Sequence, residues 1–432
     1  MINSYLEKHA FSGKEIIEAP LPGLGLVVVI PCYNEPHLLK TLTSLAACTL
    51  PRCKTEVIVV INSSEDTADT ILQQNRFTET ELERWILKNE CNELRYYYLT
   101  KDKLPAKDAG VGLARKIGMD EAIRRFDTAG NENGVIICLD ADCTVEANYL
   151  TALENHFILN PDTTGCSVYF EHPLSGDDFT PPVYEGIARY ELFLRYYNCG
   201  LRLSGYPFAY HTIGSSMAVR TKVYQQQGGM NKRKAGEDFY FLSKVFPLGG
   251  FTELNETTVF PSPRPSDRVP FGTGKAITKW LDQNSTDYTS YSPKTFTDLS
   301  ELILLVPEFY NQTAATITTH TRSLSPALIA FLEQNEFMKK VEELNSNVNS
   351  KGQFVNRFYR WFTNFMVLKF VHFARDTYYP QVAIERAATE LLELAGIEVD
   401  SNATTQELLL IFRELERNNK AVLSPFAGTE RL

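Results

Sequence analysis

The chain has 432 residues, 44% of them hydrophobic and 22% charged, so it can bury a large core and is not a disordered chain. Its formal net charge is -10 and its Lys and Arg residues are scattered, which argues against a nucleic-acid partner. The eight cysteines form no CxxC pair, and several lie in apolar runs. This pattern favours a reducing cytoplasmic location over a secreted one.

The sequence contains no segment typical of a signal peptide or a membrane span. Residues 1–15 lack an apolar core, and no stretch of about 18 apolar residues is free of charge. The longest candidate, residues 361–374, is interrupted by Asn364, Lys369 and His372, so we interpret it as a buried or interfacial helix. We therefore expect no transmembrane segment and a cytoplasmic protein, with peripheral contact at the inner membrane face left open.

Three short apolar runs predict strands that are buried on both faces of a parallel sheet: residues 25–31, 56–61 and 134–139. Amphipathic helical patterns follow these runs or lie between them: residues 35–47, 66–74 and 112–126. This alternation predicts a doubly wound α/β domain, in which ligands bind beyond the carboxyl ends of the strands.

The C-terminal part of the sequence predicts helices instead of strands. Amphipathic patterns occupy residues 328–345, 354–376, 383–394 and 405–418, and a stretch rich in Pro, Gly and Ser at 260–274 marks the transition. We predict an N-terminal extension at 1–24, a nucleotide-binding α/β domain at 25–275, and a mainly helical C-terminal region at 276–432.

The first predicted strand ends in the segment PCYNEP, which places an aromatic ring and a carboxylate at a ligand-facing edge. Tyr33 can pack on a base, and Glu35 can accept a hydrogen bond from a base or a ribose. The alternative is a turn into a helix, with Asn34 as N-cap and Pro36 in the first turn. The residues alone leave both interpretations open.

Two further polar segments lie where this edge of the sheet is expected. The second strand ends at Asn62 in the sequence NSSED, in which Ser64 or Asp66 can simply cap the next helix. Residues 107–116 form a glycine-bearing turn into a helix, where free N–H groups attract anions. Lys107, Gly110 and Arg115 are therefore candidates for a diphosphate site, although such a glycine pattern is weak on its own.

The third predicted strand leads into Asp140, Ala141 and Asp142. Carboxylates two residues apart on an extended segment point the same way and can bind one hard cation together. The alternative is a solvated turn in which Asp142 caps a helix that begins near Val145. The position of the pair at a third neighbouring strand end favours the cation site.

Two later segments carry charged candidates. Glu237 and Asp238 lie at an apparent helix start, where the helix dipole alone favours acids, so structural and catalytic roles are both open. Residues 261–275 contain Arg264 and Arg268 beside glycines, and this segment can close over a diphosphate or grip an anionic acceptor. A solvated linker between domains is the alternative.

Together, and in this order, these motifs resemble family 2 glycosyltransferases of the GT-A fold, over roughly residues 26–246. The P-x-Y-N-E, DxD, G-S-x-x-x-x-R and ED motifs of that family match Pro31, Tyr33, Asn34 and Glu35; Asp140 and Asp142; Gly214, Ser215 and Arg220; and Glu237 and Asp238.

The resemblance implies a nucleotide diphosphate sugar as donor, bound at the first two strand ends, and a Mn²⁺ or Mg²⁺ ion. Asp142 would hold the metal, with Asp140 near the metal or the ribose, and Asp238 would be the catalytic base. The expected reaction is a single, inverting transfer to an acceptor hydroxyl. The acceptor class, whether glycan, lipid-linked or small molecule, is not readable from the motifs.

Several features depart from the family pattern. Ile61 and Asn62 replace the usual aspartates after the second strand, and the first histidine after Asp238 is His320. His211 lies upstream, where a core or acceptor-loop role is as open as metal ligation. The QxxRW signature of processive members is absent.

These departures keep one alternative open, a degenerate protein that binds nucleotide sugars as a scaffold. A sugar nucleotidyltransferase is less consistent with the sequence. Those enzymes resemble one another in a G-G-x-G-T-R loop after the first strand, and this chain has PCYNE there instead.

Overall fold

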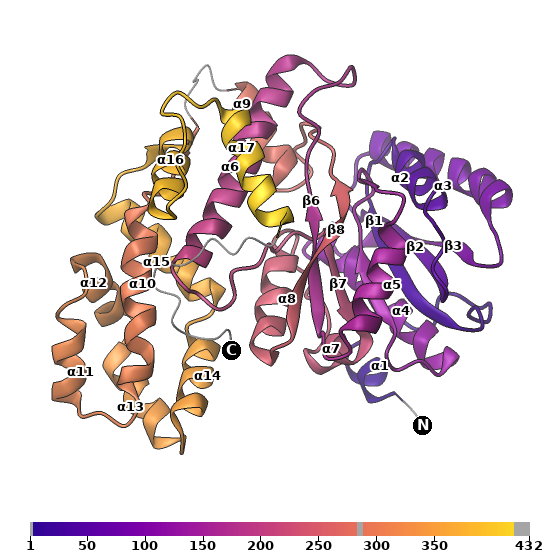
Figure 1. The fold of residues 1–432 in the computed structure, drawn as a ribbon. Helices are drawn as coiled ribbons and strands as arrows, with labels where there is room; N and C mark the ends of the chain where they lie inside the picture. The colour runs from indigo at the N-terminus through magenta and orange to yellow at the C-terminus, as the bar shows by residue number, and fades with distance from the viewer. Residues whose placement is uncertain (1–2, 283–287, 419–432) are drawn as a thin grey trace. The chain divides into compact units, whose positions relative to one another are not determined.

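The computed structural model describes residues 3–282 and 288–418, which fall into two compact units (Figure 1). The first unit comprises Met1–Phe179 and His211–Thr278, and the second comprises Thr180–Tyr210 and Lys279–Leu432. A segment between two strands of the first unit therefore belongs to the second. The domain boundaries at residues 24 and 275 remain predictions.

In the described residues of the first unit, eight strands form one sheet in the order β3-β2-β1-β4-β7-β6-β8-β5. Their bounds are β1 Leu24–Cys32, β2 Lys54–Ser64, β3 Leu94–Leu104, β4 Val135–Cys138, β5 Thr144–Val145, β6 Gly165–Phe170, β7 Met217–Arg220 and β8 Phe251–Phe260. Strands β1 to β4 pair in parallel, whereas β7 is antiparallel to both β4 and β6. The sheet is therefore mixed, with a parallel N-terminal half.

The three predicted strands are confirmed as β1, β2 and β4, and they lie side by side with β1 in the middle. Strand β3 was not predicted. It is an edge strand whose side chains are only partly buried, so its sequence LRYYYLTKDKL lacks a continuous apolar run. The three candidate strand ends are thus neighbours at one edge of the sheet.

In the first unit, helices connect these strands, as the ribbon in Figure 1 shows. Their bounds are α1 Ser4–Lys8, α2 Leu38–Ala46, α3 Asp69–Asn89, α4 Val111–Ala129, α5 Tyr149–Leu159, α7 Thr221–Gln226 and α8 Glu237–Val245, with a 3-10 turn at Phe246–Leu248. Helix α9, Thr273–Asp282, crosses into the second unit.

Two helix starts differ from the alternatives that the sequence left open. Helix α2 begins at Leu38, so Asn34 is not its N-cap and Pro36 is not in its first turn. Helix α3 begins at Asp69 after Ala68, so neither Ser64 nor Asp66 is its N-cap. Asn34 and Asp66 lie in the loops that follow β1 and β2, and Ser64 is the last residue of β2, so these polar residues lie at the strand ends.

The core of the first unit lies between the parallel strands and α4. The side chains of β1 from Val27 to Ile30 are fully buried, as the continuous apolar run predicts. Helix α4 packs on β1 and β2 at Gly118, where an added Cβ would meet Val29 Cγ1 at 2.4 Å and Val60 Cγ2 at 3.1 Å. Glycine is therefore required for this close helix–sheet approach.

The N-terminal segment is attached to the same helix through a buried carboxylate. The Tyr5 hydroxyl donates to Asp120 Oδ1 at 2.6 Å, and the Phe11 amide donates to Asp120 Oδ2 at 2.9 Å. The N-terminal extension therefore packs against α4 through Tyr5 and Phe11.

The second unit is mainly helical, and its helices α10, α16 and α17 pack against α6. Its bounds are α6 Pro181–Leu203, α10 Lys294–Leu305, α11 Ala314–Thr321, α12 Pro326–Gln334, α13 Phe337–Ser346, α14 Lys351–Trp361, α15 Asn364–Thr377, α16 Ile384–Leu394 and α17 Thr405–Arg417, with a 3-10 turn at Val306–Phe309 and a small sheet of β9 Thr289–Ser290 and β10 Val382–Ala383.

Two of the predicted C-terminal helices are each split in two. Residues 328–345 break at Glu336, which has a positive φ of 50°, and residues 354–376 break at Phe362 and Thr363. The predicted helix at 361–374 was therefore wrong at its N-terminal end. Among the described residues, no helix is both long and apolar enough to cross a membrane. The predicted fold class, an α/β domain followed by a mainly helical C-terminal region, is confirmed.

The close approach at Gly118 predicts a stability effect. We expect Gly118→Ala to lower the free energy of unfolding by about 1 to 3 kcal/mol, because the methyl group overpacks against Val29. Gly352→Ala is the matched control, since that helical glycine has no heavy atom within 4 Å and should gain up to about 1 kcal/mol. Urea denaturation measures both, and an unchanged Gly118→Ala variant would contradict this packing.

Candidate functional site

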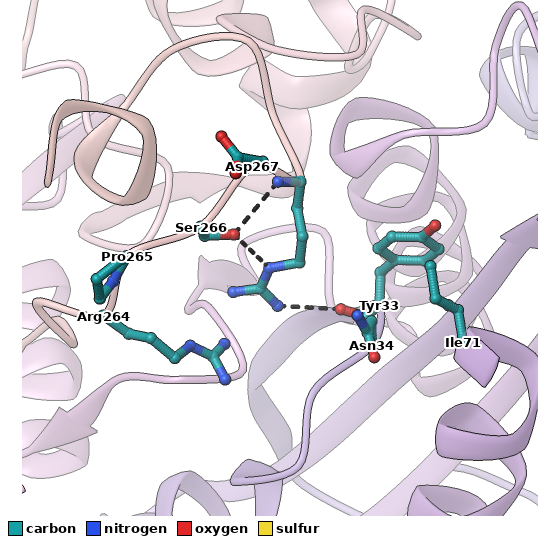
Figure 2. A pocket seen from close by; sticks show the side chains of 8 residues that line it. Tyr33, Asn34, Ile71, Arg264, Pro265, Ser266 and Asp267 are labelled. Carbon is teal, nitrogen blue, oxygen red and sulfur yellow. Dashed lines mark hydrogen bonds between the residues drawn. The ribbon is translucent and has the colours of Figure 1, made fainter. Parts of the chain in front are cut away.

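A cavity of about 490 Å³ opens at the carboxyl end of β1, beside the loop that follows β8 (Figure 2). Its lining residues are Tyr33, Asn34, Ile71, Arg264, Pro265, Ser266, Asp267 and Arg268. Figure 2 shows the Tyr33 ring beside Ile71, with Arg264 on the other side of the cavity. The cavity therefore combines an aromatic and aliphatic wall with a cationic one.

The backbone at this strand end is held by a side chain that the sequence did not single out. Asn34 has a positive φ of 50°, and its N–H donates to Asn75 Oδ1 at 2.9 Å. Asn75 Nδ2 in turn donates to the carbonyl of Asn62 at 3.1 Å. This amide of α3 thereby ties the ends of β1 and β2 together. A single polar residue within a long helix has no spacing pattern that would reveal it.

Glu35 is almost fully buried and binds two guanidinium groups. Arg264 and Arg268 both donate to its carboxylate, with Arg264 Nη1 at 3.2 Å from Oε1 and Arg268 Nη1 at 3.1 Å from Oε2. Arg268 Nη1 also donates to the Tyr33 carbonyl at 3.0 Å. Because a buried carboxylate needs such partners, Glu35 anchors residues 261–272, which we call the arginine loop.

Asp142 faces the same arginines at longer range. Its Oδ2 atom is 3.4 Å from Arg268 Nη2 and 3.6 Å from Arg264 Nη2. Burial raises the pKa of Asp142 to about 6; Arg268 and Arg264 oppose this shift, and the neighbouring carboxylates Asp140 and Glu35 add to it. This carboxylate is thus only partly compensated by the protein.

The alternative interpretation, in which Asp142 caps a helix near Val145, is wrong. Thr144 and Val145 form the short strand β5, and the next helix begins at Tyr149. The turn is instead held by α2, because the Thr41 hydroxyl donates to the buried Ala141 carbonyl at 2.9 Å. The turn that carries Asp142 therefore has a fixed position against the sheet.

Asp140 has a different partner from Asp142. Strand β4 ends at Cys138, so the two carboxylates lie beyond the strand, and they pair with different arginines. The buried Arg115 donates through Nη2 to Asp140 Oδ1 at 2.5 Å and through Nη1 to Glu237. Burial alone would lower the pKa of Arg115, but the facing carboxylates of Glu237 and Asp140 raise it. Arg115 therefore joins the DxD turn to the ED pair.

Two glycines make room for this arrangement. An added Cβ on Gly214 would lie 2.3 Å from Arg115 Nη1, so the guanidinium needs the bare backbone there. Gly236, with a φ of +69°, precedes Glu237 at the start of α8. The predicted helix start at the ED pair is confirmed.

Asp238 lies next to this network. Its Oδ1 atom accepts from the Phe239 amide at 2.7 Å, and burial raises its pKa although Arg115 opposes the shift. A carboxylate with a raised pKa is better matched to proton transfer near neutral pH. The role of Asp238 as catalytic base remains a prediction.

The donor set near Asp142 fits a hard cation only in part. Asp142 offers one carboxylate with long ion pairs, whereas Asp140 is bound closely by Arg115. No group of three or more His, Cys, Asp or Glu side chains suited to a metal occurs in the described part of the chain. Mg²⁺ commonly binds one or two carboxylates together with substrate phosphates and water, so Asp142 fits as a single protein ligand.

The remaining candidates lie outside the cavity lining. Lys107 is exposed, and Gly110 is the N-cap of α4. Pro31 lies within β1, and Ser215 is buried just before β7. These positions leave their proposed roles as predictions.

Arg220 and His211 have structural contacts. The Arg220 guanidinium donates to the carbonyls of Thr163 and Phe157, at 2.9 and 2.8 Å, and thus joins the end of β7 to α5 and to the loop that follows α5. The His211 ring packs edge-on against Phe170.

Comparisons with known proteins give one family match. The profile described as Glycosyl transferase family 2 matches residues 27–226. No curated protein matches the chain.

Solved structures show a distant likeness in three dimensions, with TM-scores below 0.5. TarS residues 1–349 from S. aureus, solved with UDP-GlcNAc, is 14% identical over 93% of this chain and 90% of that chain, with a TM-score of 0.38. The mannosyltransferase PcManGT from Pyrobaculum calidifontis, solved with GDP-Man and Mn²⁺, is 16% identical over 83% and 91%, with a TM-score of 0.33.

The raised pKa of Asp142 predicts how stability depends on pH. The folded state binds this proton more tightly than the unfolded state, so ionisation destabilises the fold above about pH 6 and has no effect below about pH 4. We expect Asp142→Asn to be more stable than the parent at pH 7.5, with the difference shrinking as the pH falls from 6 to 4.

Urea denaturation across that pH range measures the difference. Asp178→Asn, which changes an exposed aspartate of the same unit, should show no such trend. A constant difference for Asp142→Asn would contradict the inferred burial.

Proposed function

We propose that the protein moves one sugar from a nucleotide diphosphate sugar to an acceptor hydroxyl, and the match of residues 27–226 to the Glycosyl transferase family 2 profile supports this proposal. The observation that carries the proposal is the cavity at the end of β1, where Arg264 and Arg268 face Tyr33 and reach Asp142. Ligand sites of α/β sheets lie at such strand ends.

The donor would bind along this cavity. The ring of Tyr33 and the side chain of Ile71 offer an apolar wall for the nucleotide base. The guanidinium forks of Arg264 and Arg268 match diphosphate oxygens in geometry and charge. Glu35 holds both arginines, so its proposed role changes from a contact to the ribose to the support of the phosphate-binding groups.

Asp142 would hold a Mn²⁺ or Mg²⁺ ion as its one protein carboxylate, with phosphate oxygens and water completing the shell. When bound, the cation supplies positive charge to the leaving diphosphate. Arg264 and Arg268 would stabilise the same developing charge, and their ion pairs with Glu35 keep them in place. Metal dependence is thus part of the proposal.

Asp238 would act as the catalytic base. It takes the proton of the acceptor hydroxyl while the hydroxyl oxygen attacks the anomeric carbon and the bond to the diphosphate breaks. Such a single displacement inverts the anomeric configuration. Glu237 is bound to the buried Arg115 and so fixes the first turn of α8 that presents Asp238.

A donor-binding scaffold without catalysis is the second candidate, because Ile61 and Asn62 replace the family's usual aspartates. Isothermal titration followed by an assay of nucleotide release separates the two. Binding without release over a broad acceptor panel would favour the scaffold.

The metal role of Asp142 is tested with a donor screen by thermal shift. UDP, GDP and dTDP sugars are compared in Mn²⁺ and in EDTA. A matching donor at 100 times its Kd should stabilise the protein by about 2.7 kcal/mol. Asp142→Asn should lose the part of this stabilisation that requires Mn²⁺. If Mn²⁺ changed the donor-induced thermal shift equally in parent and variant, Asp142 would not be the metal ligand. If no donor produced a thermal shift in the parent, the proposed function would be contradicted.

The base role of Asp238 is tested by Asp238→Asn. We expect donor binding to persist while transfer falls by about 10² to 10⁴-fold, because the amide cannot accept the proton. Asp69→Asn is the matched control, since Asp69 is also a first-turn acid of a helix but is exposed on α3. Unchanged turnover in Asp238→Asn would show that another group is the base.

A further inference from the structure

The arginine loop reaches beyond the donor cavity to the start of α8. Three residues after Arg268, the loop presents Phe271, whose side chain is 57% exposed. An added Cβ on Gly236 would meet the Phe271 ring at 3.0 Å from Cζ and 3.3 Å from Cε2. The ring therefore lies directly against the residue that precedes Glu237 and Asp238.

This placement depends on Gly236. A side chain there would push the ring away, and the positive φ of +69° further disfavours any residue but glycine. One loop thus holds Arg268 on Glu35 and Asp142 and, a few residues later, holds an aromatic ring beside the candidate base. An exposed ring in this position is not explained by the donor cavity.

The surroundings of Phe271 favour a sugar over a lipid as its occupant. Lipid tails need a contiguous apolar patch. The helix start beside the ring instead carries Asp238, which is partly exposed, and segment 232–234 just before it is cationic and exposed. A pyranose suits such a site, because its C–H face can stack on the negative face of an aromatic ring while its hydroxyls meet polar groups.

The spacing also fits. Consecutive Cα atoms lie about 3.8 Å apart, so the Cα atoms of Gly236 and Asp238 are at most about 7.6 Å apart. A sugar ring stacked on Phe271, which contacts Gly236, therefore lies close to the backbone that carries Asp238.

We propose that Phe271 is the platform on which a sugar ring of the acceptor stacks, so that the acceptor is a carbohydrate whose hydroxyl faces Asp238. This inference rests on the proposed function, since it assigns the acceptor side of the same site. Phe271 binds and orients the acceptor, and the proton transfer and bond changes remain those described for Asp238.

The test measures nucleotide release from the donor that binds in the thermal-shift screen. The probes are methyl glycosides of glucose, galactose, mannose and N-acetylglucosamine, compared with glycerol and with dodecyl phosphate. We expect at least one methyl glycoside to stimulate release. Phe271→Ala should then raise its KM about tenfold with kcat changed less than threefold, and donor affinity should stay unchanged.

Two variants separate stacking from mere bulk. Phe271→Trp should keep the KM within about threefold of the parent, because the aromatic face is retained, whereas Phe271→Leu should resemble Phe271→Ala. Leu87→Ala is the control for loss of an exposed apolar side chain, since Leu87 is 86% exposed on α3 and lies outside the site.

The inference is overturned if Phe271→Leu behaves as the parent, if Phe271→Ala leaves the acceptor KM unchanged, or if dodecyl phosphate stimulates release and no methyl glycoside does. Absence of stimulation by every saccharide also contradicts it. These failures are distinct from failure of the proposed function, which would appear as no donor binding in the parent protein.

Discussion

A guanidinium that is removed from water must be neutralised by carboxylates, and in this protein that requirement joins the two acidic motifs. Arg115 is buried, and it binds Asp140 in the turn after β4 and Glu237 at the start of α8. Breaking such a buried pair from one side commonly costs about 3 to 5 kcal/mol. The relative positions of the DxD turn and of Asp238 therefore depend on this one side chain, and Gly214 provides the space that it occupies.

A second charge network occupies the same edge of the sheet. Glu35 is buried after β1 and fixes Arg264 and Arg268, which also approach Asp142 at 3.4 to 3.6 Å. The two networks differ in how well their carboxylates are compensated by cationic partners. Glu35 is fully paired, but Asp142 keeps a raised pKa, as expected where a protein retains an unfavourable charge for a ligand. The incomplete partner set of Asp142 is the reason to expect a cation and a diphosphate there.

The arginine loop connects the donor cavity with the start of α8. Through Arg264 and Arg268 it forms one wall of the cavity, and through Phe271 it contacts the backbone at the start of α8. The donor and acceptor sides of the proposed reaction are thus organised by one segment, which is anchored by Glu35. A loop held in this way can orient both substrates without contributing the base itself.

The parallel half of the sheet and the convergence of the motifs were predictable, because strands β1, β2 and β4 are continuous apolar runs and such strands end at one edge. The partners within the site were not. Arg268 lies 126 positions from Asp142, and Arg115 lies 122 positions from Glu237, and no local periodicity reports such contacts. Residue patterns also missed Asn75, which joins two strand ends from within a helix.

Strand and helix boundaries failed where local geometry overrides the pattern. The partly buried edge strand β3 has no continuous apolar run, and a left-handed residue at Glu336 splits one amphipathic pattern into two helices. The turn at Asp140 to Asp142 was expected to be extended, but β4 ends at Cys138, so the two carboxylates separate toward different arginines.

We infer that a nucleoside diphosphate binds between the arginine loop and Asp142, and a crystal structure of the protein with UDP or GDP and Mn²⁺ would test this inference. We expect phosphate oxygens within hydrogen-bond distance of Arg264 or Arg268, the base against Tyr33, and the metal beside Asp142. A nucleotide bound elsewhere, with the cavity at the end of β1 empty, would contradict it.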